Sequence, residues 1–127
     1  YAQINEVINT LLDEGKIPAN EICILTPIAR HKSHLKELKL SSSAKLSDKW
    51  PPENNCIYWD TIYSFKGLEC SAVIIVELDY WLEKYTGETS FNHLKSLLYV
   101  GCSRARNHLV IVLRKSEKKL NRVILGK

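Results

Sequence analysis

The spacing of apolar residues predicts a helix, then a buried strand, then a second helix at the start of the chain. The first helix has apolar residues at the i, i+3, i+4, i+7 and i+8 spacing of an amphipathic helix: Ile4, Val7, Ile8, Leu11 and Leu12. Gly15 lies just beyond the last apolar pair, where a helix is expected to stop. Residues 22–25 form a short continuous apolar run, which indicates a strand buried on both faces. A second helical pattern contains Leu35 and Leu38, with lysines on its other faces.

The rest of the chain predicts an alternation of strands, loops and helices. Three further apolar runs indicate strands, at residues 56–59, 72–78 and 109–113. A segment rich in Ser, Pro, Lys and Asn, residues 41–55, predicts a long loop or insertion. A helix capped by Thr89 or Ser90 is expected to run to about Arg106, and residues 114–127 form a basic tail. This alternation predicts an α/β fold with a mostly parallel sheet flanked by helices.

Length and composition narrow the class of protein. At 127 residues, with 45% hydrophobic and 25% charged residues, the chain is expected to form one globular domain. The net charge of +4 permits contact with nucleic acid and fits an ordinary solvated surface equally well. No apolar run reaches the roughly 18 residues of a membrane span, and no secretion signal is visible, so we expect a cytoplasmic protein without a membrane partner. The chain starts at Tyr1 and contains no methionine, which suggests a piece of a longer protein.

The cysteines and histidines predict neither a disulfide framework nor a metal site. Cys23, Cys56, Cys70 and Cys102 are widely spaced, without a Cys-x-x-Cys pair. Three of them lie inside or beside apolar runs, and we expect these to be small buried hydrophobic residues in a reducing compartment. His31 and His34 are three residues apart, but no further metal ligands accompany them in sequence.

A polar cluster around one glycine is the first candidate for chemistry. Residues 61–69 read T-I-Y-S-F-K-G-L-E and follow the predicted strand at 56–59, so they lie at the carboxyl end of a strand, where open α/β sheets bind ligands. Gly67 allows a close backbone approach to a phosphate, and Glu69 offers acceptors for ribose hydroxyls. The same segment also fits a solvated turn without any ligand.

The second candidate is the pair of arginines near the end of the predicted C-terminal helix. Arg104 lies at the edge of an apolar stripe, where an arginine either extends to solvent or reaches a cleft and neutralises charge on a transferring phosphoryl group. Arg106 is two residues further on, about 200° around a helix, so it points elsewhere. We therefore expect Arg104 to be the catalytic candidate and Arg106 a surface or structural residue.

Two elements of a complete nucleotide site are missing from the sequence. No segment matches G-x-x-x-x-G-K-[ST], the loop that binds nucleotide phosphates. No acidic pair of the magnesium-binding kind follows a strand, and Glu77 and Asp79 stand alone at a strand end. A domain with a catalytic arginine and no phosphate loop must complete its site with another domain.

Together these segments resemble UvrD/Rep-type superfamily 1 DNA helicases. Residues 61–69 resemble motif V of that family, usually T-x-H-x-x-K-G-L-E, and residues 98–106 look like motif VI, typically Y-V-(A/G)-x-(T/S)-R-A. The similarity is sharpest over about residues 56–113, and the strand at 22–25 falls where motif IV is expected. The resemblance implies the second, C-terminal RecA-like domain of an ATP-dependent helicase or translocase. Such a domain lacks a phosphate loop of its own.

The resemblance also implies which residues face ATP. Arg104 would be the arginine finger toward the γ-phosphate, Glu69 would contact the ribose, and Lys66 and Gly67 would lie near the phosphates. ATP would bind in the cleft against an N-terminal RecA-like domain of the same protein, which would hold most of the Mg²⁺ ligands. The motif IV arginine is replaced by Pro27, and Arg30 is the candidate substitute.

On the side of the nucleic acid, the resemblance implies that Thr61, Tyr63 and Ser64 contact the backbone of single-stranded DNA. Tyr63 stands where the family usually has histidine. The large domain that many of these helicases insert before motif V is absent, and only the loop at 41–55 remains. The alternative function is a non-catalytic RecA-like module that binds nucleic acid or protein.

Overall fold

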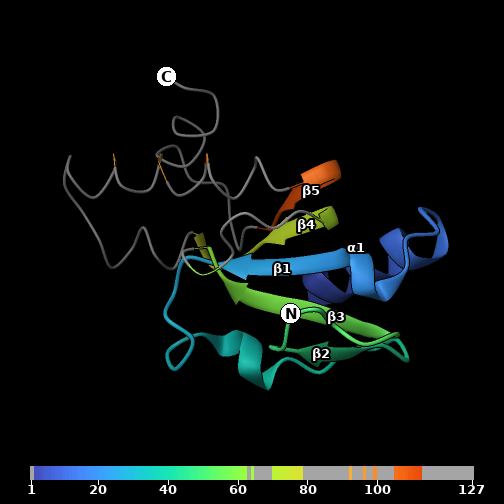
Figure 1. The fold of residues 1–127 in the computed structure, drawn as a ribbon, viewed down its shortest axis with the longest axis horizontal. Helices are drawn as coiled ribbons and strands as arrows, with labels where there is room; N and C mark the ends of the chain where they lie inside the picture. Colours follow the sequence, from blue (N-terminus) through green and yellow to red (C-terminus); the bar gives the residue numbers. More distant parts are fainter. Residues whose placement is uncertain are drawn as a thin grey trace.

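The computed structural model describes residues 2–62, 64, 70–78, 92, 96, 99 and 105–112. Within them, five strands form one parallel sheet in the order β2-β3-β1-β4-β5 (Figure 1). The strands are β1 (Ile22–Thr26), β2 (Lys45–Ser47), β3 (Cys56–Thr61), β4 (Cys70–Ile75) and β5 (Ala105–Ile111). The helical elements are α1 (Ala2–Asp13) and the short 3₁₀ turns η1 (Ala19–Glu21) and η2 (His34–Glu37). The predicted α/β fold with a parallel sheet is confirmed.

Helix α1 ends where the sequence predicts, and the glycine there has a steric reason. The backbone N–H of Gly15 donates to the carbonyl oxygen of Thr10 at 3.0 Å. A Cβ atom at Gly15 would lie 2.9 Å from the carbonyl oxygen of Leu11, closer than such atoms normally approach. Lys16 then adopts a positive φ of 51°, which turns the chain toward η1. A larger residue at position 15 would have to displace this helix end.

The hydrophobic core lies between α1 and one face of the sheet. Alternate strand residues point toward the helix, as the two-residue repeat of a strand requires. The core residues from the helix and the sheet are Ile4, Ile8, Leu11, Ile22, Ile24, Ile57, Trp59, Ala72, Ile74 and Val76. The apolar stripe predicted for the first helix is therefore its buried face.

Strand β1 is the centre of the sheet. It pairs in parallel with β3 on one side and with β4 on the other, and all five of its residues are buried. Cys23 and Leu25, which point away from α1, are as fully buried as Ile22 and Ile24. The continuous apolar run at 22–25 is thus a strand covered on both faces, as predicted.

Three predicted elements differ from the structure. The second helix is only the 3₁₀ turn η2, which begins after Ser33, whose hydroxyl accepts a hydrogen bond from the N–H of Leu35. The segment predicted as a long loop, 41–55, contains the edge strand β2. The last strand begins at Ala105, so Arg106 lies in β5 and not at the end of a helix. The predicted basic tail at 114–127 lies outside the described residues.

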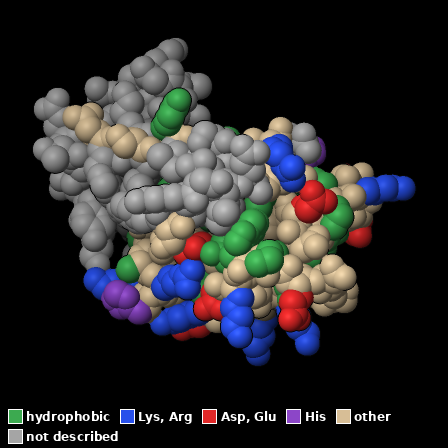
Figure 2. Space-filling view, viewed as in Figure 1, with side chains coloured by type: hydrophobic (Ala, Val, Ile, Leu, Met, Phe, Trp, Pro, Cys, Tyr) green, Lys and Arg blue, Asp and Glu red, His purple; other side chains and the backbone are tan. Residues whose placement is uncertain are grey.

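The charged side chains on the visible face are mixed in sign. Lys and Arg side chains gather over the η2 and β2 side of the molecule, and Asp and Glu side chains lie among them (Figure 2). The described residues do not form a continuous basic stripe on this face.

Within the described residues, no helix is long and apolar enough to cross a membrane.

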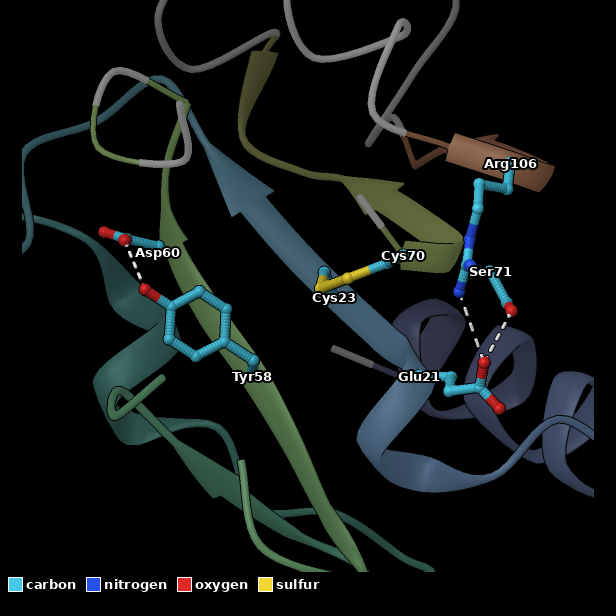
Figure 3. The surroundings of a disulfide bond; sticks show 7 residues. All are labelled: Glu21, Cys23, Tyr58, Asp60, Cys70, Ser71 and Arg106. Atoms are coloured by element: carbon cyan, nitrogen blue, oxygen red, sulfur yellow. Dashed lines mark hydrogen bonds and ion pairs between the residues drawn. A yellow bond between two sulfur atoms is a disulfide. The ribbon is translucent and has the colours of Figure 1, made fainter. Parts of the chain in front are cut away.

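A disulfide joins two neighbouring strands, which the sequence analysis did not predict. Cys23 in β1 and Cys70 at the start of β4 are bonded, with Cα atoms 6.4 Å apart (Figure 3). The expectation that both are reduced is wrong in this structure, because the parallel pairing of β1 and β4 brings together two residues far apart in sequence. Cys56 is a free thiol.

Replacing both Cys23 and Cys70 by alanine is expected to lower the free energy of unfolding by about 2–4 kcal/mol. The bridge closes a long loop and so restricts the conformational freedom of the unfolded chain. The loop has a sequence separation of 47. Denaturant unfolding of the oxidised proteins measures this loss. Cys56→Ala is the matched control and should cost less than about 1 kcal/mol. Alkylation of Cys23 and Cys70 in unfolded, unreduced protein would contradict the bridge.

Candidate functional site

The carboxyl ends of the three central strands meet at one edge of the sheet. Thr26 at the end of β1 lies opposite Thr61 at the end of β3. The N–H of Ile62 donates to the carbonyl of Thr26 at 2.9 Å, and the N–H of Val76 donates to the carbonyl of Leu25 at 3.0 Å. The segments after β1, β3 and β4 therefore start side by side. We call the polar residues there the carboxyl edge: Thr26, Arg30, Ser33, Asp60, Thr61, Ser64 and Glu77.

Arg30 is held at the carboxyl edge by the carboxylate of Asp60. Its Nε donates to Asp60 Oδ1 at 3.0 Å, and its Nη2 lies 2.7 Å from the same oxygen. The guanidinium also lies over the Trp59 ring, 6.0 Å from the centroid. The hydrogen bond to Asp60 raises the pKa of Arg30 above its usual value, against the opposing effect of burial. Arg30 keeps its charge and its orientation while 43% of its side chain stays exposed.

Asp60 is the buried anion at the centre of this edge. Only 3% of its side chain is exposed, and it accepts hydrogen bonds from two further donors besides Arg30. The N–H of Thr61 donates to Oδ1 at 2.7 Å, and the hydroxyl of Tyr58 donates to Oδ2 (Figure 3). Burial, and then the bond to Asp60, raise the pKa of the Tyr58 phenol well above its usual value. A buried carboxylate needs such donors, because unpaired it would lose its hydration without compensation.

The segment after β3 begins with a hydroxyl-rich turn. The hydroxyl of Thr61 donates to Ser64 Oγ at 3.0 Å, and the N–H of Ser64 reaches the Thr61 hydroxyl at 3.2 Å. Thr61 is buried whereas Ser64 is exposed. The structure thus brings together two of the three residues predicted to contact DNA, and it orients the Ser64 side chain to solvent.

Glu77 fixes the segment after β1 against the end of β4. Its carboxylate accepts hydrogen bonds from the hydroxyl of Thr26 at 2.8 Å, the hydroxyl of Ser33 and the N–H of His34 at 3.2 Å. Glu77 has a positive φ of 63°, an uncommon backbone conformation for a residue other than glycine. These three donors lie more than 40 residues away in sequence, so the fold alone brings them to Glu77.

Five of the predicted site residues lie outside the described residues, so their roles stay predictions: Tyr63, Lys66, Gly67, Glu69 and Arg104. Arg30, Thr61 and Ser64 are described and converge on the carboxyl edge. In the part of the chain that the structure describes, no group of three or more His, Cys, Asp or Glu side chains is arranged to hold a metal ion. Arg106 is a surface residue, as predicted, with 51% of its side chain exposed. Its Nη2 lies 3.3 Å from Glu21 Oε1 (Figure 3).

Asp60 and Tyr58 were not predicted from the sequence as parts of this edge. The available signal was position: Asp60 ends an apolar run immediately before Thr61, where a carboxylate has no use in a core. Tyr58 lies two residues earlier and therefore on the same side of the strand. Their bond to each other could have been predicted from that spacing.

A hollow lies next to the candidate site and shares the Trp59 ring with Arg30. It measures about 480 Å³ and lies against Leu35, Leu38, Ala44 and Trp59, with Lys36, Lys39 and Lys45 around it. None of the predicted site residues lines it.

The fold and the carboxyl edge define an α/β domain of the RecA-like class. The crystal structure of the C-terminal domain of a possible DNA helicase from Lactobacillus plantarum WCFS1 is similar, with a TM-score of 0.61 and 21% sequence identity. The similarity covers 94% of this chain and 72% of that one. At this level of identity the likeness concerns the fold.

A family model matches part of the chain. Residues 56–112 match the UvrD-like helicase C-terminal domain, and this stretch contains both the T-I-Y-S-F-K-G-L-E segment and the segment with Arg104. The resemblance to UvrD-like helicases predicted from those two segments is thereby confirmed. A search of curated proteins finds no match.

Tyr58 should stay protonated at a pH where an ordinary phenol is ionised. A tyrosine with a pKa of 10 is about 90% ionised at pH 11, whereas Tyr58 should be mostly neutral there. The difference between the ultraviolet titrations of wild type and Tyr58→Phe isolates this residue. Because the folded pKa is raised, the stability that the phenol provides is complete below about pH 10 and falls as the pH rises further. A transition near pH 10 in the difference titration would contradict the contact with Asp60.

Proposed function

We propose that this chain is the C-terminal RecA-like half of an ATP-dependent DNA helicase or translocase. The observation that carries the proposal is the match of residues 56–112 to UvrD-like helicase C-terminal domains, since it contains both candidate segments. The geometry of the carboxyl edge supports it. Arg30 presents charge there, beside the hydroxyls of Thr61 and Ser64, at the place where α/β sheets bind ligands.

Arg104 is the catalytic residue in this proposal. An arginine finger stabilises the charge that develops on the transferred phosphoryl group, and its effect depends on closure against the other half of the site. Lys66 and Gly67 lie near the phosphates, Glu69 accepts hydrogen bonds from the ribose, and Arg30 adds a further positive charge. Its raised pKa keeps that charge at any working pH.

The single-stranded DNA track uses hydroxyl groups. Thr61, Tyr63 and Ser64 would contact the backbone of the strand, and such contacts position a strand without reading its sequence. These residues lie just before residues 66–69 in the chain, so one short segment would face both ligands. Closing and opening of the two halves would then move the DNA contacts relative to the other domain.

The other half of the site belongs to an N-terminal RecA-like domain of the same protein. It supplies the phosphate loop, which this sequence lacks, and most of the ligands of Mg²⁺. In this proposal the described part of the edge contributes the charge of Arg30 and the hydroxyls of Thr61 and Ser64. A cytoplasmic location is part of the proposal.

Arg104→Ala in the full-length protein is expected to lower ATP turnover by about 10³-fold or more, the loss typical of a missing arginine finger. Steady-state ATPase measurements at saturating single-stranded DNA test this. Arg106→Ala is the matched control two residues away, because Arg106 pairs with Glu21 at the surface. An unchanged turnover of Arg104→Ala would overturn the catalytic assignment.

The isolated chain of 127 residues is expected to hydrolyse no ATP, because it lacks a phosphate loop. The measurement is phosphate release by the isolated chain and by the full-length protein. Turnover by the isolated chain would contradict the divided site. No turnover by either one, even with single-stranded DNA present, would favour the alternative of a non-catalytic binding module.

A further inference from the structure

One carboxylate oxygen connects the two ligand sides of the proposed site. Asp60 Oδ1 accepts from Arg30 Nε at 3.0 Å, from Arg30 Nη2 at 2.7 Å and from the N–H of Thr61 at 2.7 Å. Arg30 is the candidate contact to ATP, and Thr61 opens the segment proposed to contact DNA. The two roles therefore meet at a single buried atom.

Arg30 is free to serve a second anion while it is held by Asp60. A guanidinium carries five N–H donors, and Nε and one donor of Nη2 point at Asp60. Its Nη1 lies 3.9 Å from Asp48 Oδ2, too far for a hydrogen bond, and 43% of the side chain is exposed. A phosphate group at the carboxyl edge can thus compete with Asp60 for the same arginine.

Such competition has a cost, and among the described residues Thr61 and Tyr58 are the remaining donors that can offset it. If Arg30 turns toward a phosphate, Oδ1 loses up to two of its three donors, while the carboxylate stays 3% exposed. When a buried anion loses hydrogen-bond donors, either its remaining hydrogen bonds become stronger or the structure shifts to bring in new donors. The remaining donor on Oδ1 is the backbone of Thr61, whose hydroxyl in turn holds Ser64.

We propose that Asp60 is a positioning residue that couples Arg30 on the ATP side to Thr61 and Ser64 on the DNA side. It touches neither ligand and acts by sharing one oxygen between the two. The inference rests on the proposed function. By linkage, the coupling is reciprocal: DNA held by Thr61 and Ser64 changes the hold of Asp60 on Arg30, and so changes the affinity for ATP.

The alternative is that Asp60 only stabilises the fold. That role predicts a lower unfolding free energy for any change at Asp60 and no change in how DNA affects ATP turnover. The two roles therefore differ in a measurable ratio, the ATP turnover with single-stranded DNA divided by the turnover without it.

The test is Asp60→Asn in the full-length protein, with that ratio and the apparent KM for ATP measured with and without oligothymidylate. Asparagine keeps the shape and an acceptor but removes the charge that holds Arg30. We expect the ratio to fall at least about fivefold, the lower end of typical coupling between sites. The KM for ATP should respond less to DNA than in wild type.

Asp48→Asn is the matched control, since it makes the same change at the other, exposed carboxylate near Arg30. Its ratio should stay within about twofold of wild type. Arg30→Lys is the second variant, because lysine keeps the charge but loses the two-donor contact with Asp60. It should lower the ratio as Asp60→Asn does, and it decides the question if Asp60→Asn fails to fold.

A ratio retained by folded Asp60→Asn, or by Arg30→Lys in its place, would overturn the coupling while leaving the helicase assignment intact. A wild-type protein without any DNA-stimulated ATP turnover would overturn the proposed function and the coupling together. Equal losses in Asp60→Asn and Asp48→Asn would also sink the coupling, because they would reflect general charge at this edge.

Discussion

The burial of β1 on both faces is the constraint on which the rest of this structure depends. A strand with no exposed side must have every backbone group paired and every side chain apolar or satisfied. Pairing with β3 and β4 meets the first demand and fixes the register of the sheet. Because both partners are parallel to β1, their carboxyl ends fall at one edge. The polar residues that end these strands are therefore neighbours in space although they are distant in sequence.

At that edge, polar side chains sit at the boundary of a dry core, and each has to be satisfied. Asp60 and Glu77 satisfy the polar groups around them in the same way. Each carboxylate accepts hydrogen bonds from three or more donors. Glu77 braces the segment that leads to Arg30, and Asp60 orients Arg30 itself. Hydrogen bonds thus hold the two carboxylates of the carboxyl edge in place, while the side chains of Arg30 and Ser64 are exposed to solvent.

Local patterns in the sequence predict the sheet well because burial leaves a strong signature. The runs at 22–25 and 56–59 became β1 and β3, and the stripe of α1 became its core face. The strand ends were less predictable, since Thr26 and Asp60 are polar and belong to strands only because tertiary partners satisfy them. Likewise the Arg30–Asp60 contact spans 30 residues and exists only once β1 and β3 have paired. The disulfide escaped prediction for the same reason.

The disulfide between Cys23 and Cys70 has a mechanical consequence. Tension applied along the chain passes directly from β1 to β4 through the sulfur atoms and bypasses everything between them. Strands β2 and β3 and the turn η2 all lie inside that bypassed segment, together with Arg30 and Asp60. In a protein that pulls on a strand, the bridge would shield this part of the site from load, so that force cannot peel it away from the sheet.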